Sequence, residues 1–137
     1  MSFDLYLTCF GEREKLGLST QAIRSLFPIE ETRSGPDRWH VRYGQADCCE
    51  IYVTLVPNDA LKLSFINVNR PCGDSRFWES LYTILGMGSV ALYFPGGPPI
   101  LASGTSADGF PLDEAASRRE PVYVGSGEAI LRILREC

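Results

Sequence analysis

The chain lacks the sequence patterns that mark most catalytic and cofactor sites. Its 137 residues include one histidine, His40, and five cysteines without a Cys-x-x-C pair. No glycine-rich loop ends in the Lys-Ser or Lys-Thr of a nucleotide site, and Gly86 and Gly88 follow a helical pattern instead of preceding one. Cys48 and Cys49 point to opposite faces of any strand that holds them, which disfavours joint metal binding. The sequence therefore predicts no catalytic residue, no metal site and no cofactor.

The chain is also poor in lysine, in net positive charge and in long apolar runs. Eleven of its thirteen basic residues are arginine, and a net charge of −4 gives no general attraction to nucleic acid or anionic lipid. The uncharged segment 80–107 is apolar only as far as Phe94, whereas a membrane span needs roughly 20 apolar residues. The N-terminal MSFDLYLTCF has no cationic lead, and an odd number of cysteines favours reduced thiols. We therefore expect a cytoplasmic protein that binds neither nucleic acid nor a membrane.

What is present is the patterning of a single α+β domain over residues 1–137. Apolar residues alternate from Phe3 to Cys9 and predict a first strand. Alternating segments at about 37–69 predict a central three-stranded meander in an antiparallel sheet. Apolar stripes, each preceded by a serine or aspartate that can cap a helix, predict three helices at about 19–27, 74–86 and 126–136. We expect these helices to pack mostly on one face of the sheet.

The register of the meander follows if its apolar side chains all lie on one face. A slip of one residue would move every side chain of a strand to the other face, so the apolar pattern restricts the pairing. The connection between the first two strands is then the three-residue turn 45–47. The predicted pairs are Arg42–Glu50, Val41–Ile51, His40–Tyr52, Val53–Leu63 and Tyr52–Ser64.

The second face of the meander gathers polar and aromatic side chains around Tyr52. Aromatic and arginine side chains within a polar rim are typical of protein interfaces. The alternative is a merely solvated sheet face, laced by cross-strand pairing of Arg42 with Glu50. The candidate partner-binding residues are Arg38, His40, Arg42, Glu50, Tyr52, Lys62 and Ser64, with Thr54 among them and Ile66 at the edge of the face.

His40 and Cys72 are the remaining candidates for chemistry. We interpret His40 as a solvated or partner-facing side chain, because no positioned nucleophile accompanies it. Cys72 precedes a predicted helix, whose dipole lowers a thiol pKa, but the nearby Asp74 opposes that shift. We therefore predict no catalytic role for His40 or Cys72.

Three stretches together resemble a known group of proteins. They are the opening MSFDLYL, the block FWESLYTILGMGSVALYFPGGPPILA and the closing EPVYVGSGEAILRIL. These stretches resemble small cytoplasmic immunity proteins of bacterial toxin–immunity systems, the kind encoded beside effectors of contact-dependent or type VI secretion. The resemblance implies a non-enzymatic inhibitor that binds a cognate toxin tightly. It includes no catalytic signature, so it assigns no site residues.

Two other functions stay open at this point. The first is a small-molecule-binding or enzymatic domain, with an apolar pocket between helix 74–86 and the sheet and the loop 104–109 as its lid. The second is an assembly module that forms a homodimer through an exposed strand edge.

Overall fold

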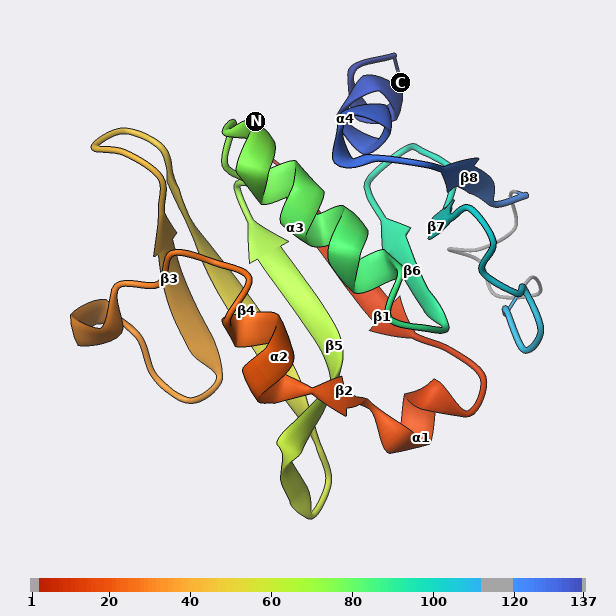
Figure 1. Ribbon diagram of the computed structural model, residues 1–137, viewed down its shortest axis with the longest axis horizontal. Helices are drawn as coiled ribbons and strands as arrows, with labels where there is room; N and C mark the ends of the chain where they lie inside the picture. The colour runs from red at the N-terminus through yellow and green to blue at the C-terminus, as the bar shows by residue number, and fades with distance from the viewer. Residues whose placement is uncertain (1–2, 112–119, 137) are drawn as a thin grey trace.

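In the computed structural model, which describes residues 3–111 and 120–136, the described strands join in one sheet (Figure 1). Their order is β3-β4-β5-β1-β6-β7-β8, with β2 paired to β5 outside this path. The bounds are β1 (Asp4–Cys9), β2 (Leu18–Ser19), β3 (Arg38–Arg42), β4 (Cys48–Val56), β5 (Asp59–Asn69), β6 (Val90–Tyr93), β7 (Ile100–Ala102) and β8 (Val122–Val124). The predicted α+β fold is confirmed. The sheet is mixed, because β7 and β8 run parallel, and the chain between them is long enough for the crossover that a parallel pair needs.

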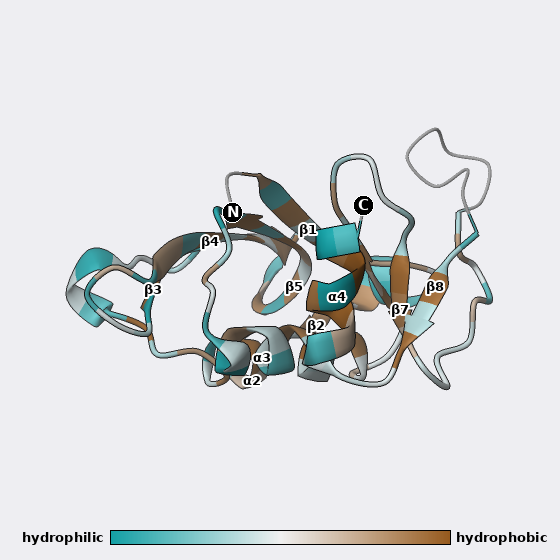
Figure 2. Cartoon of the chain, turned by 90° about the horizontal axis from the view of Figure 1, so that it is seen from above, coloured by the Kyte–Doolittle hydropathy of each residue, from teal (hydrophilic) through white to brown (hydrophobic). Residues whose placement is uncertain are grey.

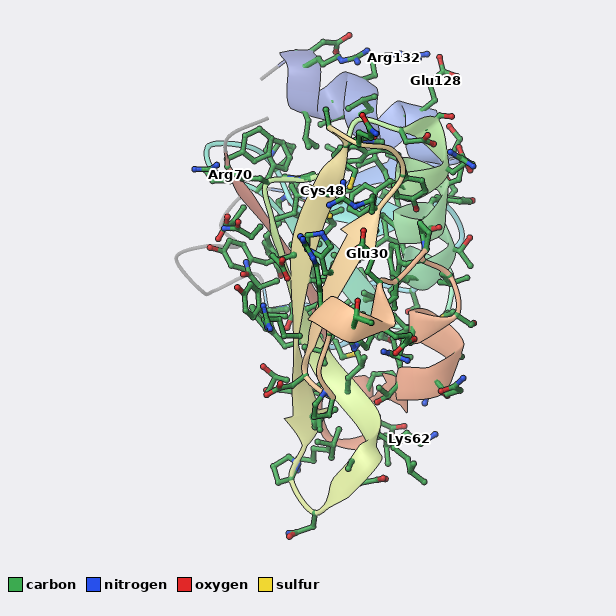
Figure 3. All side chains as sticks on the ribbon, turned by 90° about the vertical axis from the view of Figure 1, so that its left-hand side faces the viewer. Glu30, Cys48, Lys62, Arg70, Glu128 and Arg132 are labelled. Carbon is green, nitrogen blue, oxygen red and sulfur yellow. The ribbon has the colours of Figure 1, made fainter. Side chains whose placement is uncertain are left out.

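Helices cover one face of this sheet. α2 (Thr20–Arg24), α3 (Ser75–Leu85) and α4 (Gly127–Glu136) correspond to the three predicted helices, and α1 (Arg13–Leu16) and the 3-10 helix η1 (Glu31–Arg33) are additional short turns. Figures 2 and 3 show α2 and α3 on the same side of the strands. α4 packs against α3. None of the described helices is long and apolar enough to cross a membrane.

The helices begin where capping side chains are available. Ser19 Oγ accepts a hydrogen bond from the N–H of Ala22 at 3.2 Å, Asp74 caps α3, and Ser126 caps α4 in the same way. α2 ends three residues earlier than predicted. The N–H groups of Leu26 and Phe27 bond to carbonyl oxygens three residues back, which tightens the last turn into a 3-10 form.

The covered face of the sheet holds the apolar core. Trp39, Ile51, Val68 and Leu5 lie opposite one another on β3, β4, β5 and β1, and each is 0% exposed. The apolar side of α3 packs onto this face through Phe77, Trp78, Leu81, Ile84 and Leu85. Complete burial of each such side chain contributes about 1.5–3 kcal/mol to folding, so this layer fixes the strands in place.

The predicted register of β3 and β4 is wrong by two residues. The observed pairs are His40–Glu50, Val41–Cys49 and Arg42–Cys48, in place of His40–Tyr52, Val41–Ile51 and Arg42–Glu50. The turn lies one residue earlier than predicted, because the N–H of Tyr43 donates to the carbonyl oxygen of Asp47 and closes it there. A shift of two residues preserves the alternation, so each side chain keeps its predicted face.

The predicted register of β4 and β5 is also wrong, by three residues, because the pairing shifts between Leu55 and Val56 and again, at a β-bulge, between Thr54 and Leu55. Val53 and Tyr52 lie opposite Ile66 and Asn67, in place of Leu63 and Ser64. Thr54 faces Phe65 and Leu55 faces Leu63, so Ser64 is the extra residue between them. The bulge reverses the alternation beyond it. Ile66, predicted at the edge of the second face, is therefore buried in the core.

Candidate functional site

The face of the sheet that α2 and α3 leave uncovered, which we call the open face, carries a row of tyrosines. Tyr52 on β4 lies opposite Asn67 on β5, Asn67 lies opposite Tyr6 on β1, and Tyr6 lies opposite Tyr93 on β6. Arg38 on β3 extends the row beyond Tyr52. We name these five residues the tyrosine row. Neighbouring strands are about 4.8 Å apart, so the row crosses about 19 Å of the sheet.

The tyrosine row is held by ordered backbone and by its neighbours. Tyr52 exposes 43% of its surface, and Tyr6 and Asn67 are half-buried. The ring of Tyr6 packs on that of Phe65 with 5.9 Å between centroids. In the same strands, the residues next to Tyr52, Asn67 and Tyr6 belong to the core. The aromatic surface is therefore presented on a rigid support.

Asp4 orients the amide of Asn67 in this row and the amide of Asn69 next to it. Its carboxylate oxygens accept hydrogen bonds from Nδ2 of Asn69 at 3.0 Å and from Nδ2 of Asn67 at 3.4 Å. Nδ2 of Asn67 also lies 3.4 Å from the carbonyl oxygen of Leu5. These bonds fix the orientation of both amides.

His40 is wrongly predicted as a solvated or partner-facing side chain. It is 7% exposed, and its Nδ1 lies 2.6 Å from Oε1 of Glu50 on the neighbouring strand. Nη1 of Arg38 lies 3.8 Å from Oε2 of the same carboxylate. Nε2 of His40 is buried and meets no hydrogen-bond partner among the described residues. An oriented but enclosed imidazole stabilises the β3–β4 pair and is poorly placed to reach a substrate.

Arg42 is engaged within the protein. Its Nε donates to Oε1 of Glu30, and Nη1 donates to the carbonyl oxygens of Gly44 at 3.2 Å and Gln45 at 2.9 Å. The hydrogen bond from Arg42 holds the pKa of the Glu30 carboxyl below its usual value. The predicted Arg42–Glu50 pair does not form, and Arg42 instead fastens the β3–β4 turn to the segment before β3.

The remaining predicted residues do not join the tyrosine row. Ser64 is the bulge residue, and Figure 3 shows Lys62 directed to the side of the helices. Arg70, which the sequence did not single out, projects on the side of the open face (Figure 3). Sequence reasoning also misses Tyr6 and Tyr93, because no pattern in the chain indicates that β1 and β6 lie beside the meander. The available signal was the alternation of β1, which directs Tyr6 away from the core residues Leu5 and Leu7.

The open face is bounded at both ends. At the β6–β7 end, Phe10, Ala91, Leu101 and Phe110 form a second apolar cluster, in which the two phenylalanine rings meet edge to face. At the β3 end, the segment 28–35 bonds along the outer edge of the strand, through Pro28, Glu30, Ser34 and Gly35. The outer edge of β3 is therefore occupied by the chain itself.

A separate hollow lies at the C-terminal end of α3. It has a volume of about 460 Å³ and is lined by Tyr82, Thr83, Gly86, Gly88, Ser89 and residues 102–106. The predicted pocket was apolar and lay between α3 and the sheet, where buried side chains of α3 fill the space. Neither His40 nor Cys72 lines the hollow. Hydroxyl side chains and glycines make up much of its lining.

The described residues contain no group of three or more His, Cys, Asp or Glu side chains that could hold a metal ion. The chain was compared with models of protein families, with curated proteins and with solved structures, and none of the three comparisons found a match.

Proposed function

We propose that the protein is a non-enzymatic binding protein of the immunity type, which acts in the cytoplasm and neutralises a cognate bacterial toxin by direct contact. The tyrosine row is the observation that carries this proposal. It places exposed aromatic surface, flanked by amides and charges, on a sheet face that no described helix covers. Tyrosine and arginine are among the side chains that contribute most at the centre of protein interfaces.

The rigidity of the open face supports tight binding. A partner that docks on ordered strands loses little conformational entropy in ordering the surface that it meets. Asp4 already orients the amides of Asn67 and Asn69, so their remaining hydrogen-bonding capacity is available in a fixed direction. A tyrosine side chain contributes a large contact area with few rotatable bonds. These properties suit an inhibitor, which needs a complementary surface and no catalytic group.

The charges of the open face define what the partner must offer. Glu50 and Asp4 are already matched, by His40 and Arg38 and by the asparagine amides, while Arg70 is exposed on the side of this face. The centre of the partner surface should therefore consist of apolar and uncharged polar groups. The partner should also place an acidic group where it can meet Arg70.

The test is a calorimetric titration of the chain with the protein encoded in the adjacent reading frame, prepared without its toxic activity. We expect saturable binding, and a Kd raised at least about tenfold by Tyr52→Ala, since loss of a central aromatic anchor removes about 2 kcal/mol or more. Co-expression should protect cells from the active neighbour with the wild-type chain and less well with this variant. Absence of binding to a toxic neighbour would contradict the immunity function.

Tyr123→Ala is the matched control. Tyr123 lies on β8 at the other end of the same sheet and is 47% exposed, close to the value for Tyr52. Five strand spacings, about 24 Å, separate the two strands. We expect Tyr123→Ala to leave the Kd unchanged. If Tyr52→Ala and Tyr6→Ala behave like the control while the neighbour still binds, the interface lies elsewhere on the molecule.

A further inference from the structure

Two buried cysteines meet between β4 and the loop that precedes α3. Sγ of Cys72 lies 3.2 Å from Sγ of Cys49, and the two residues are 1% and 4% exposed. A disulfide places its sulfurs about 2.0 Å apart, so closing the bond requires an approach of about 1.2 Å. Rotation of two short side chains with a small shift of the loop can supply this approach.

The loop that carries Cys72 is held against the start of β4. One carboxylate oxygen of Asp47 accepts the N–H of Gly73 at 2.8 Å, and the other accepts the N–H of Asp74 at 3.0 Å. Nε1 of Trp78 donates to the carbonyl oxygen of Cys72 at 3.0 Å. These three bonds keep the two thiols together without any ligand.

We propose that Cys49 and Cys72 form a redox modification site, which a low-molecular-weight disulfide such as oxidised glutathione converts to an intramolecular disulfide. One cysteine thiolate attacks the oxidant, forms a mixed disulfide and releases one glutathione thiolate. The second cysteine thiolate then attacks the protein sulfur of the mixed disulfide and releases the second glutathione. The two cysteines lose two protons and two electrons, and one glutathione disulfide becomes two thiols.

The surroundings of the pair make this oxidation slow until the loop opens. The Cys72 thiol donates a hydrogen bond to Sγ of Cys49, and this bond and burial raise the pKa of Cys72 above its usual value. The charge of Asp47 adds to the shift. The reactive thiolate is therefore scarce in the closed loop. Asp47→Asn removes the charge and weakens the clamp on the N–H groups of Gly73 and Asp74. We expect this variant to oxidise several-fold faster than the wild-type chain.

Once formed, the bond would stabilise the support of the open face. It would join β4, which carries Glu50 and Tyr52, to the loop that caps α3. The cross-link closes the segment 49–72 and lowers the entropy of the unfolded chain, which should raise the Tm by about 5–10 °C. This inference concerns the chemistry of the thiols and does not depend on the proposed binding function.

The experiment is equilibration of the full chain with mixtures of oxidised and reduced glutathione, with and without mild urea. Alkylation of the remaining thiols, intact mass measurement and peptide mapping follow. We expect a loss of about 2 Da and a cross-link between the peptide with Cys49 and the peptide with Cys72. Urea opens the loop transiently, so slow access to the thiols cannot hide a bond that is favourable at equilibrium.

Cys48→Ala and Cys49→Ala are a matched pair of variants, because the two cysteines are adjacent in the chain. We expect the cross-link to persist in Cys48→Ala and to disappear in Cys49→Ala. The wild-type peptide map provides the same assignment if a variant does not fold. Glutathione adducts without an intramolecular bond, a cross-link through another cysteine, or an unchanged mass in urea would each overturn the proposal.

Discussion

The two faces of the sheet differ sharply in the central strands β1, β4 and β5. Ile51 and Tyr52 are neighbours on β4, yet the first is 0% and the second 43% exposed. The same contrast separates Leu5 from Tyr6 on β1 and Val68 from Asn67 on β5. Because successive side chains of a strand point to opposite faces, stability and recognition are assigned to alternate residues of one backbone. A substitution of a core residue in these strands should change folding, and one of Tyr52 or Tyr6 should change binding.

The largest effect should come from the covered face of β4. Ile51→Ala leaves a cavity at the centre of the core, and we expect it to lower the free energy of unfolding by about 2–5 kcal/mol. Tyr52→Ala, one residue further, should cost less than about 1 kcal/mol, because its lost contacts are mainly cross-strand ones. Urea unfolding followed by circular dichroism measures both values. Equal costs would show that Tyr52 supports the core and would break the distinction between the two faces.

A second, smaller effect is expected where α4 joins the covered side. A Cβ atom on Gly127 would lie 2.4 Å from the backbone carbon of Trp78, so α4 approaches α3 too closely for any side chain there. Gly127→Ala should destabilise the protein by about 1–3 kcal/mol through this overpacking. Gly125→Ala is the control, since a Cβ atom at Gly125 has nothing within 4 Å. A similar stability for the two variants would mean that α4 can move away from α3 without cost.

The sequence predicts which face of the sheet a side chain lies on better than it predicts which residue lies opposite it on the next strand. Alternation places Val41 and Ile51 in the core and Tyr52 outside, and the structure confirms this. Alternation cannot distinguish registers that differ by two residues, which is why the β3–β4 pairing was missed. The bulge at Ser64 carries no marker such as glycine, so the reversal beyond it could not be foreseen.

The sequence also does not predict that Tyr6 and Tyr93 share the open face with Tyr52. Tyr6 and Tyr93 join Tyr52 only because β1 lies between β5 and β6, an arrangement set by packing of the whole domain. Alternation correctly directs His40 away from the core. Its burial depends on Glu50 opposite it and on the segment 28–35, which bonds along the edge of β3. Contacts between segments distant in the chain therefore decide which polar residues remain accessible.

The two arginines of β3 provide a finer comparison on one face. Arg42 donates to the carbonyl oxygens of Gly44 and Gln45, so we expect Arg42→Gln to lower the free energy of unfolding by about 1 kcal/mol. Arg38 is more exposed and lies 3.8 Å from Glu50, and Arg38→Gln should cost less than about 0.5 kcal/mol. Thermal unfolding of both variants in the same buffer tests this order. A larger cost for Arg38→Gln would show that the contact of Arg38 with Glu50 stabilises the fold more than the bonds of Arg42 at the β3–β4 turn do.

The smallest effect should appear in acid, at the α3 N-terminus on the covered side. Hydrogen bonds from the side chain and backbone of Arg76 lower the pKa of Asp74 from 3.8 to about 2. A carboxyl whose pKa is lower in the folded state stabilises the protein above its unfolded pKa, and this contribution is lost as the pH falls through the interval from about 4 to about 2. Asn at position 74 still caps a helix but does not titrate. Asp74→Asn should therefore lose less stability than the wild-type chain between pH 4 and pH 2, by a margin that shrinks with added salt. Equal pH dependence in thermal unfolding would mean that the Arg76 bonds do not persist in solution.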